Sequence, residues 1–235
     1  MISHEKKYLF IRVYKTGTQS MADTLLEHDA SSMSLHCDWR VGHRPISIDD
    51  RVCRNECLCD VRKMCLKDGR PNKGTRGSVF LRGHHSKSSW FKEKLFPKEG
   101  WDWDKYFKFC FVRNPWDREL SSYFFQERRY GASIGKVSFK DYLDQAFSRS
   151  RTYAVNNYQC EYTTDVDYIA RFENYKDEVD YLLDKLGISL GDSEPKHAHK
   201  TIHKPYWEYY DDDDIKKVGD WYKKDIDMFD YKFGE

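Results

Sequence analysis

The first apolar segment of the chain leads into a loop whose residue types could hold an anion. Residues 7–14 (KYLFIRVY) are rich in β-branched and aromatic side chains, which predicts a buried strand. The next six residues offer anion-binding groups: Lys15, Thr16, Gly17, Thr18, Gln19 and Ser20. Residues 21–28 have helical spacing, so the loop precedes a helix N-terminus, where backbone N–H groups favour negative charge. A phosphate- or sulfate-binding loop is one interpretation, and a capped turn is the other.

The order of residues in this loop differs from that of the loop that binds Mg²⁺–nucleoside triphosphates. That loop has the pattern G-x-x-x-x-G-K-[ST], in which lysine follows the second glycine and a hydroxyl residue for Mg²⁺ comes next. Here Lys15 precedes Gly17. A P-loop-like nucleotide kinase is therefore an alternative that the sequence does not favour.

A second group of anion-binding residues follows a later strand. Residues 106–113 (YFKFCFVR) predict a strand, and Asn114-Pro115 precedes a helix predicted over residues 116–129. Arg113 then lies at the carboxyl end of the strand, where ligands of open α/β folds bind, and Ser121 lies two turns along the helix. A guanidinium fork with a hydroxyl group is a good clamp for a phosphate. The alternative is an arginine in an ordinary ion pair and a serine that faces solvent.

The two motifs, in this order, resemble those of the sulfotransferases that use 3′-phosphoadenosine 5′-phosphosulfate (PAPS). That family has a K-x-G-T-x-S-like loop after its first strand and R-[ND]-P-x-x-R-x-x-S after a later one, which match residues 15–20 and 113–121. The resemblance implies that the loop holds the 5′-phosphosulfate and that Arg113 and Ser121 hold the 3′-phosphate. It also implies a catalytic Lys15, whose charge would offset the charge that develops on the bridging oxygen as the leaving phosphate departs.

Further segments resemble one branch of that family, which includes carbohydrate sulfotransferases and small microbial and algal enzymes. They are residues 106–109 (YFKF), residues 171–174 (RFEN) and the ending from 209 to 231, and only residues 29–77 have no counterpart. The implied activity is transfer of a sulfuryl group from PAPS to a hydroxyl or amine of a small-molecule or carbohydrate acceptor. A module that binds PAPS without turnover is the alternative.

Two adjacent histidines are candidates for the catalytic base. Attack by a hydroxyl requires a group that takes its proton, and histidine is suited to this near neutral pH. The family places its catalytic histidine after the strand that precedes the Arg113 strand, which here is predicted at residues 78–82. His84, in the sequence Gly-His-x-Ser, fits that place better than His85, and Ser86 could cap the helix predicted to about residue 95. One of the two histidines is expected to be structural.

Three more residues have roles implied by the resemblance. Phe172 could lie against the adenine of the donor, although a core phenylalanine is the more usual outcome. Lys200 and Lys204 lie in a loop where the family often adds a basic contact to the 3′-phosphate. Solvent exposure of these two lysines is the alternative.

Four cysteines in the unmatched stretch raise the question of a metal: Cys53, Cys57, Cys59 and Cys65. Their spacing lacks the paired C-x₂-C elements of common zinc sites, so free thiols or a disulfide are favoured over structural zinc. The proposed chemistry requires no metal. The run of aspartates at residues 211–214 is interpreted as the start of a helix rather than a Ca²⁺ site, because the interleaved EF-hand pattern is absent.

The elements that must position these residues alternate between strand and helix. A further strand is predicted at residues 166–172, and the remaining helices are predicted at 137–149 with Ser138 as cap, at 175–186 and at 211–225. Strands followed repeatedly by helices favour a parallel sheet with helices on both faces. The fold class is therefore α/β, as one sulfotransferase domain over residues 1–235 with the P-loop-like fold that the resemblance implies. The acceptor side is assigned to residues 29–77, the helices after Arg113 and the loop at 191–204.

Composition limits the partners and the compartment. The net charge of +1 gives no field that would attract nucleic acid, and no apolar run is long enough to span a membrane. The polar N-terminus has no signal-peptide pattern, and seven cysteines cannot all pair within the chain, so a cytoplasmic location is expected. Neither the acceptor nor the oligomeric state is predicted by the sequence.

Overall fold

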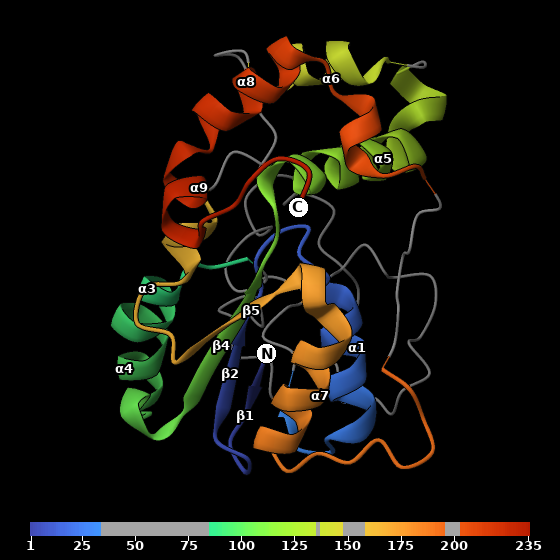
Figure 1. Ribbon diagram of the computed structural model, residues 1–235. Coiled ribbons are helices and arrows are strands. Elements are labelled where there is room, and N and C mark those ends of the chain that lie inside the picture. Colours follow the sequence, from blue (N-terminus) through green and yellow to red (C-terminus); the bar gives the residue numbers. More distant parts are fainter. Residues whose placement is uncertain (34–84, 135–136, 148–157, 196–202) are drawn as a thin grey trace, which may run out of the picture.

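The computed structural model describes residues 1–33, 85–134, 137–147, 158–195 and 203–235. Within these residues the chain forms a five-stranded sheet with the strand order β3-β1-β2-β4-β5 (Figure 1). The strands are β1 (Ile2–Ser3), β2 (Tyr8–Ile11), β3 (Ser32–Met33), β4 (Phe107–Val112) and β5 (Tyr168–Arg171). The strands predicted around β2, β4 and β5 are thereby confirmed, whereas the one predicted at residues 78–82 lies outside the described residues.

The sheet is parallel only in its central part. β2 pairs with β4 and β4 with β5 in parallel, with Phe10 opposite Phe109 and Phe111 opposite Ala170. β1 pairs antiparallel with both β2 and β3, so the prediction of a parallel sheet is corrected at this edge. The reason is the short link between β1 and β2, because a connection of a few residues can join only antiparallel neighbours.

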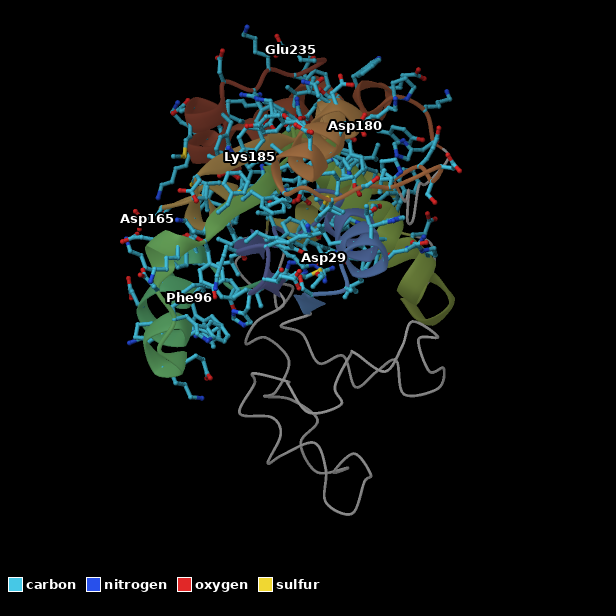
Figure 2. The ribbon with its side chains drawn as sticks, turned by 90° about the horizontal axis from the view of Figure 1, so that it is seen from below. Asp29, Phe96, Asp165, Asp180, Lys185 and Glu235 are labelled. Carbon is cyan, nitrogen blue, oxygen red and sulfur yellow. The ribbon has the colours of Figure 1, made fainter. Side chains whose placement is uncertain are left out.

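Helices cover both faces of the sheet, and the alternation of side chains along β2 shows why. Tyr8 and Phe10 pack with α1 (Thr18–His28) and α7 (Tyr175–Lys185), while Leu9 and Ile11 pack against the other helical layer. That layer consists of α3 (Ser88–Trp90), the π-helical segment η2 (Phe91–Leu95) and α4 (Phe96–Glu99). Seen from below in Figure 2, Phe96 of α4 and Asp180 of α7 lie on opposite sides of the strands. Burial of one such apolar side chain contributes about 1.5–3 kcal/mol.

Two helix starts differ from the prediction. α1 begins at Thr18, immediately after Gly17, rather than at residue 21. The helix predicted from Ser86 begins at Ser88 with Lys87 at the N-cap and no side-chain cap, so the expected role of Ser86 as cap is wrong. That helix also continues past residue 95, through a π-helical turn, until Gly100 ends it in a left-handed conformation (φ 71°).

A third layer of helices lies beyond the carboxyl ends of β2 and β4, at the top of Figure 1. It is formed by α5 (Pro115–Ile134), α6 (Phe139–Ala146), α8 (Asp212–Trp221) and α9 (Lys223–Phe229). These helices share one apolar cluster that includes Trp116, Leu143 and Val218. The caps predicted at Ser138 and in the aspartate run are confirmed, since Ser138 and Asp211 each accept a hydrogen bond from a backbone N–H three residues on. The single helix predicted at 211–225 is two helices, separated at Tyr222.

Short 3₁₀ turns connect these elements: η3 (Trp103–Lys105), η5 (Gln159–Tyr162), η6 (Phe172–Asn174) and η7 (Tyr206–Tyr209). Two of them, η5 and η6, lie next to the predicted site. No helix in the described part of the chain has both the length and the apolar character needed to cross a bilayer.

Candidate active site

The loop after β2 has a backbone conformation that only a small residue at position 17 allows. Lys15 and Gly17 both have positive φ, 63° and 72°. A Cβ atom at Gly17 would lie 2.7 Å from Cε2 of Phe172 and 3.0 Å from Cε2 of Tyr175, so a side chain there would clash. Gly17 is the N-cap of α1 and no side chain caps that helix. The first backbone N–H groups of α1 are thus the kind of group that holds an anion.

The other predicted residues of this loop divide between shaping it and lining it. The Thr16 hydroxyl donates to the carbonyl oxygen of Val13 (3.1 Å), which closes the turn. The Gln19 side chain accepts from Nη2 of Arg12 (2.9 Å) and donates to Oδ1 of Asp23 (2.7 Å). Thr16 and Gln19 therefore hold the loop in shape. The predicted hydroxyls of Thr18 and Ser20 lie in the first turn of α1 and are buried.

The Lys15 ammonium lies in an apolar and cationic setting. Its Nζ lies 4.5 Å from the centre of the Phe125 ring. Burial is the largest cause that lowers the pKa of Lys15, and together with the positive charges of Arg113 and Arg128 it brings this pKa to about 7. An anion bound beside Lys15 would reverse this effect, because opposite charge favours the protonated amine.

Arg113 joins the second predicted motif to the first. Its Nη1 donates to the carbonyl oxygen of Lys15 (3.3 Å), across 98 positions of the sequence. Its Nε donates to Oδ2 of Asp117 (2.7 Å), and its guanidinium carbon lies 4.1 Å from the centre of the Phe172 ring. Two of the five guanidinium N–H donors are thus used within the described part of the chain. The remaining donors suit a phosphate.

The helix that follows Arg113 carries three of the relevant side chains on one stripe. Asp117, Ser121 and Phe125 are four residues apart, so they lie one above another along α5. Because Asp117 contacts Arg113 and Phe125 contacts Lys15, Ser121 lies on the stripe between the two cations, and it is half-buried. The helix start is fixed by Asn114, whose Oδ1 accepts from the backbone N–H of Trp116 (3.2 Å), with Pro115 as first residue.

The strand end after β5 contributes to the same place. Phe172 lies between Gly17 and the Arg113 guanidinium, so its ring contacts both motifs. Oε1 of Glu173 accepts the backbone N–H of Asn114, and burial raises the pKa of Glu173. The structure therefore brings Phe172 to the predicted site, packed against protein groups on at least two sides.

His85 lies at the edge of the loop. Its Nδ1 is 2.9 Å from the carbonyl oxygen of Arg12, and its ring is edge-on to Tyr14 with centroids 5.3 Å apart. A carbonyl oxygen can only accept, so Nδ1 carries the proton and Nε2 of the neutral ring is the basic nitrogen. His84 lies outside the described residues.

The two lysines expected near the 3′-phosphate are not brought to this site by the described structure. The Lys204 side chain is 74% exposed and forms an ion pair with Glu208 (3.3 Å). Lys200 lies outside the described residues, as do Cys53, Cys57, Cys59 and Cys65. Among the described residues, no group of three or more His, Cys, Asp or Glu side chains is placed to hold a metal.

Several residues of the site were not predicted. Asp117 carries a local signal, since an acid four residues after Arg113 on a helix is placed to pair with it. Phe125 and Arg128 lie on the continuation of the same helix, and their spacing from Ser121 could have suggested them. Gln159 contacts both backbone polar groups of Arg113 but is 46 positions away in sequence, with no local signal.

Comparisons with known proteins find a protein family and a solved structure to which the chain is similar. A family model described as "Sulfotransferase family" matches residues 1–232. Among solved structures, the crystal structure of a sulfotransferase from Alicyclobacillus acidocaldarius is similar, with 17% sequence identity and a TM-score of 0.46. That match covers 94% of this chain and 93% of the other. No curated protein matches the chain.

Proposed function

The chain belongs to the sulfotransferase family, and from this premise we propose that PAPS is its sulfuryl donor and a hydroxyl or amine its acceptor. The observation that carries the proposal is the meeting of the two anion-binding motifs, in which Nη1 of Arg113 donates to the carbonyl oxygen of Lys15. PAPS carries one anionic group at each of two ribose positions, and two neighbouring cationic sites suit such a ligand.

The residues fit a 3′,5′-substituted nucleotide in a specific way. The uncapped N-terminus of α1 and the ammonium of Lys15 would hold the 5′-phosphosulfate, while Arg113 and Ser121 would hold the 3′-phosphate. The absence of a side chain at Gly17 lets the loop backbone lie close to Phe172. Phe172, whose ring lies against the Arg113 guanidinium, would also contact the nucleotide.

The chain's own residues would then assist an in-line transfer. The acceptor oxygen or nitrogen attacks sulfur as the bond between sulfur and the bridging oxygen of the 5′-phosphate breaks, and adenosine 3′,5′-bisphosphate leaves. Protonated Lys15 would stabilise the charge on that bridging oxygen. The acceptor proton would pass to a histidine of the pair His84 and His85.

A different observation supports each of the two histidines as the catalytic base. The sequence resemblance supports His84, and the tautomer fixed by the Arg12 carbonyl oxygen supports His85, whose Nε2 is then the basic nitrogen. The variants His84→Ala and His85→Ala distinguish the two. Loss of the base should lower kcat by roughly 10²–10⁴-fold with little change in donor Kd. Loss of a structural histidine should instead lower Tm with a small effect on kcat.

The acceptor class is proposed from the family alone: a small molecule or carbohydrate with a hydroxyl or amine. Transfer from ³⁵S-labelled PAPS to a panel of sugars, phenols and amines would identify the acceptor. No step in the proposed reaction calls for a metal ion.

The donor assignment is tested by ligand-dependent stability. Adenosine 3′,5′-bisphosphate and PAPS should raise Tm in a concentration-dependent way, because a ligand that binds only the folded state stabilises it. Arg113→Met should abolish the increase, whereas the exposed Lys216→Ala should not change it. A larger increase with Mg²⁺–ATP would favour a nucleotide kinase. Binding of PAPS without transfer to any acceptor, unaffected by either histidine variant, would favour a non-catalytic binding module.

A further inference from the structure

A buried polar chain leads from the C-terminal helix α9 to Arg113. The carboxylate of Asp225 accepts hydrogen bonds from the backbone N–H groups of Gln159 (2.8 Å) and Cys160 (3.0 Å). The side chain of Gln159 in turn accepts from the backbone N–H of Arg113 (2.9 Å) and donates to the Arg113 carbonyl oxygen (2.8 Å). Gln159 and Asp225 are both fully buried.

The Gln159 side chain takes the place of a neighbouring strand at Arg113, because it bonds both the backbone N–H and the C=O of that residue. β4 ends at Val112, which pairs with Arg171 in the ladder to β5, so Arg113 is the first residue after β4 and lies beyond that ladder. A backbone N–H and C=O buried there need partners. A carboxamide offers one acceptor and one donor on the same planar group, which matches this pair of requirements. Gln159 therefore satisfies both backbone polar groups of Arg113.

Asp225 fixes Gln159 in its turn. A buried carboxylate is costly unless it is hydrogen-bonded and balanced in charge. Asp225 has two backbone donors, and its Oδ2 lies 3.9 Å from Nη2 of Arg118, which is buried over the Tyr222 ring. Arg118 lies on α5, a little more than one turn after Arg113. The turn at 159–160 is thus bonded to Asp225 of α9, which in turn lies near a buried cation of α5.

We propose that Gln159 and Asp225 are positioning residues of the donor site, which set the place of the Arg113 guanidinium and so the affinity for the 3′-phosphate of the nucleotide. This inference rests on the function proposed above. It gives a role to Asp225, which lies in the segment from 209 to 231 that resembles the family but has no assigned part in the chemistry.

The test compares two nucleotides that differ in the 3′-phosphate. In Gln159→Leu, the Kd for adenosine 3′,5′-bisphosphate should rise about tenfold to a hundredfold, because a misplacement of about 1 Å has effects of this size. The Kd for adenosine 5′-monophosphate, which is the same nucleotide without the 3′-phosphate, should change less than about twofold, because its 5′-phosphate would be held by Lys15 and the start of α1 rather than by Arg113. Asp225→Asn keeps one acceptor oxygen and should give a smaller loss with the same selectivity.

Two controls separate positioning from general damage. Thr163→Val removes the hydrogen bond from Oγ1 of Thr163 to the Cys160 carbonyl oxygen (3.0 Å) in the same turn, and should leave both Kd values unchanged. In an Arg113→Met background, Gln159→Leu should add no further loss, because the two substitutions act on one contact.

The inference is overturned if Gln159→Leu weakens both nucleotides equally, or if its effect persists without Arg113. The proposed function fails differently: the wild-type protein would then show no preference for the nucleotide with the 3′-phosphate. If Gln159→Leu does not fold, Asp225→Asn decides by the same ratio of Kd values.

Discussion

The two cationic groups of the site are held in opposite ways. Arg113 has both of its backbone polar groups bonded to Gln159 and its Nε bonded to Asp117. Lys15 has a strained backbone conformation (φ 63°), and within the described residues its ammonium contacts an aromatic ring and no carboxylate. We call the first group, Arg113 with Gln159 and Asp117, the Arg113 anchor, and the second, residues 15–17, the Lys15 loop.

The difference indicates that the Arg113 anchor and the Lys15 loop have different roles. A guanidinium stays charged at all physiological pH values, so the Arg113 anchor presents a fixed charge at a fixed place. A lysine that is desolvated beside two arginines has a lowered pKa, and an anion beside it would favour its charged form, so the Lys15 loop is expected to respond to the ligand. A left-handed conformation at a residue other than glycine costs about 1–3 kcal/mol, and such strain tends to occur at functional sites. Binding strength is therefore expected from the anchor and catalysis from the loop.

The largest effect is expected from Lys15→Met, which keeps the apolar contact with Phe125 and removes the charge. Loss of one charge-stabilising donor typically lowers kcat by about 10²–10³-fold, and a loss of that size is expected here. The Kd for adenosine 3′,5′-bisphosphate should rise less than it does in Arg113→Met. Steady-state kinetics and calorimetry would measure the two effects, and a larger change in Kd than in kcat would reverse the assignment.

Lys108→Met is the matched control for that variant. Lys108 is also buried over an aromatic ring, with Nζ 5.3 Å from the centre of the Trp103 ring, but it lies beneath the other helical layer and pairs with Asp167 (3.0 Å). Its removal should lower stability and leave kcat unchanged. Lys15→Met should instead raise the stability of the free protein, because the pKa of Lys15 is lowered on folding. A lowered lysine pKa costs stability below the folded pKa of about 7, and this cost falls as pH rises toward the unfolded value of 10.5.

The contrast also explains which parts could be predicted from sequence. The Lys15 loop and the positions of Arg113 and Ser121 are contiguous motifs next to strands with clear periodicity, so local reasoning located them. The partners that hold Arg113 in place, Gln159 and Asp225, come from a 3₁₀ turn and a C-terminal helix whose approach depends on tertiary packing. No local sequence pattern indicates that the Gln159 carboxamide replaces the backbone hydrogen bonds of a neighbouring strand.

The predicted boundaries of helices and strands are wrong where a local sequence rule competes with tertiary packing. Ser86 is a good capping residue by type, yet the helix begins at Ser88, whose fully buried position places the start of the helix against the sheet layer. The antiparallel strands β1 and β3 have two residues each, too few for a periodic pattern. β1 pairs with β2 along the side that faces away from β4, and β3 pairs in turn with β1.

The next largest effect is expected from Gly17→Ala in the Lys15 loop. The new Cβ would lie 2.7 Å from Phe172 and the backbone would keep a positive φ, so either the loop or Phe172 must move. A loss of affinity for the donor of about tenfold to a hundredfold is expected, because a 1 Å shift in a binding group has consequences of this order. Gly100→Ala is the control, since Gly100 has almost the same φ (71°) but nothing within 4 Å of the new Cβ. Equal losses of Tm in both variants, with donor affinity retained, would show that the contact between Gly17 and Phe172 has no bearing on the site.

A smaller effect is expected from pH, and it should separate the two cations. The Lys15 pKa of about 7 means that the free protein loses this charge as pH rises through 7. Donor affinity should therefore fall by about fivefold from pH 7 to 8, with a proton taken up on binding at the higher pH. Calorimetry in buffers of different ionisation enthalpy would count that proton. Lys15→Arg should flatten the profile above pH 7 because arginine stays charged. A profile that keeps its slope in Lys15→Arg would assign the titration to another group.

The smallest effect is expected from Lys204→Ala, which tests whether a third cation belongs beside the anchor and the loop. Lys204 is 74% exposed on its side chain and pairs with Glu208 four residues later. Lys216 is equally exposed and pairs with Asp220 in the same way on α8, so Lys216→Ala is a matched control. Exposed pairs of this kind contribute roughly 0.3–0.5 kcal/mol, and both variants should change Tm alike and the Kd for adenosine 3′,5′-bisphosphate by less than about twofold. A loss of affinity in Lys204→Ala alone would mean that Lys204 contacts the 3′-phosphate when the nucleotide binds. Since Arg113 is already fixed without it, such a contact would act through the rate of nucleotide release, which stopped-flow displacement would detect.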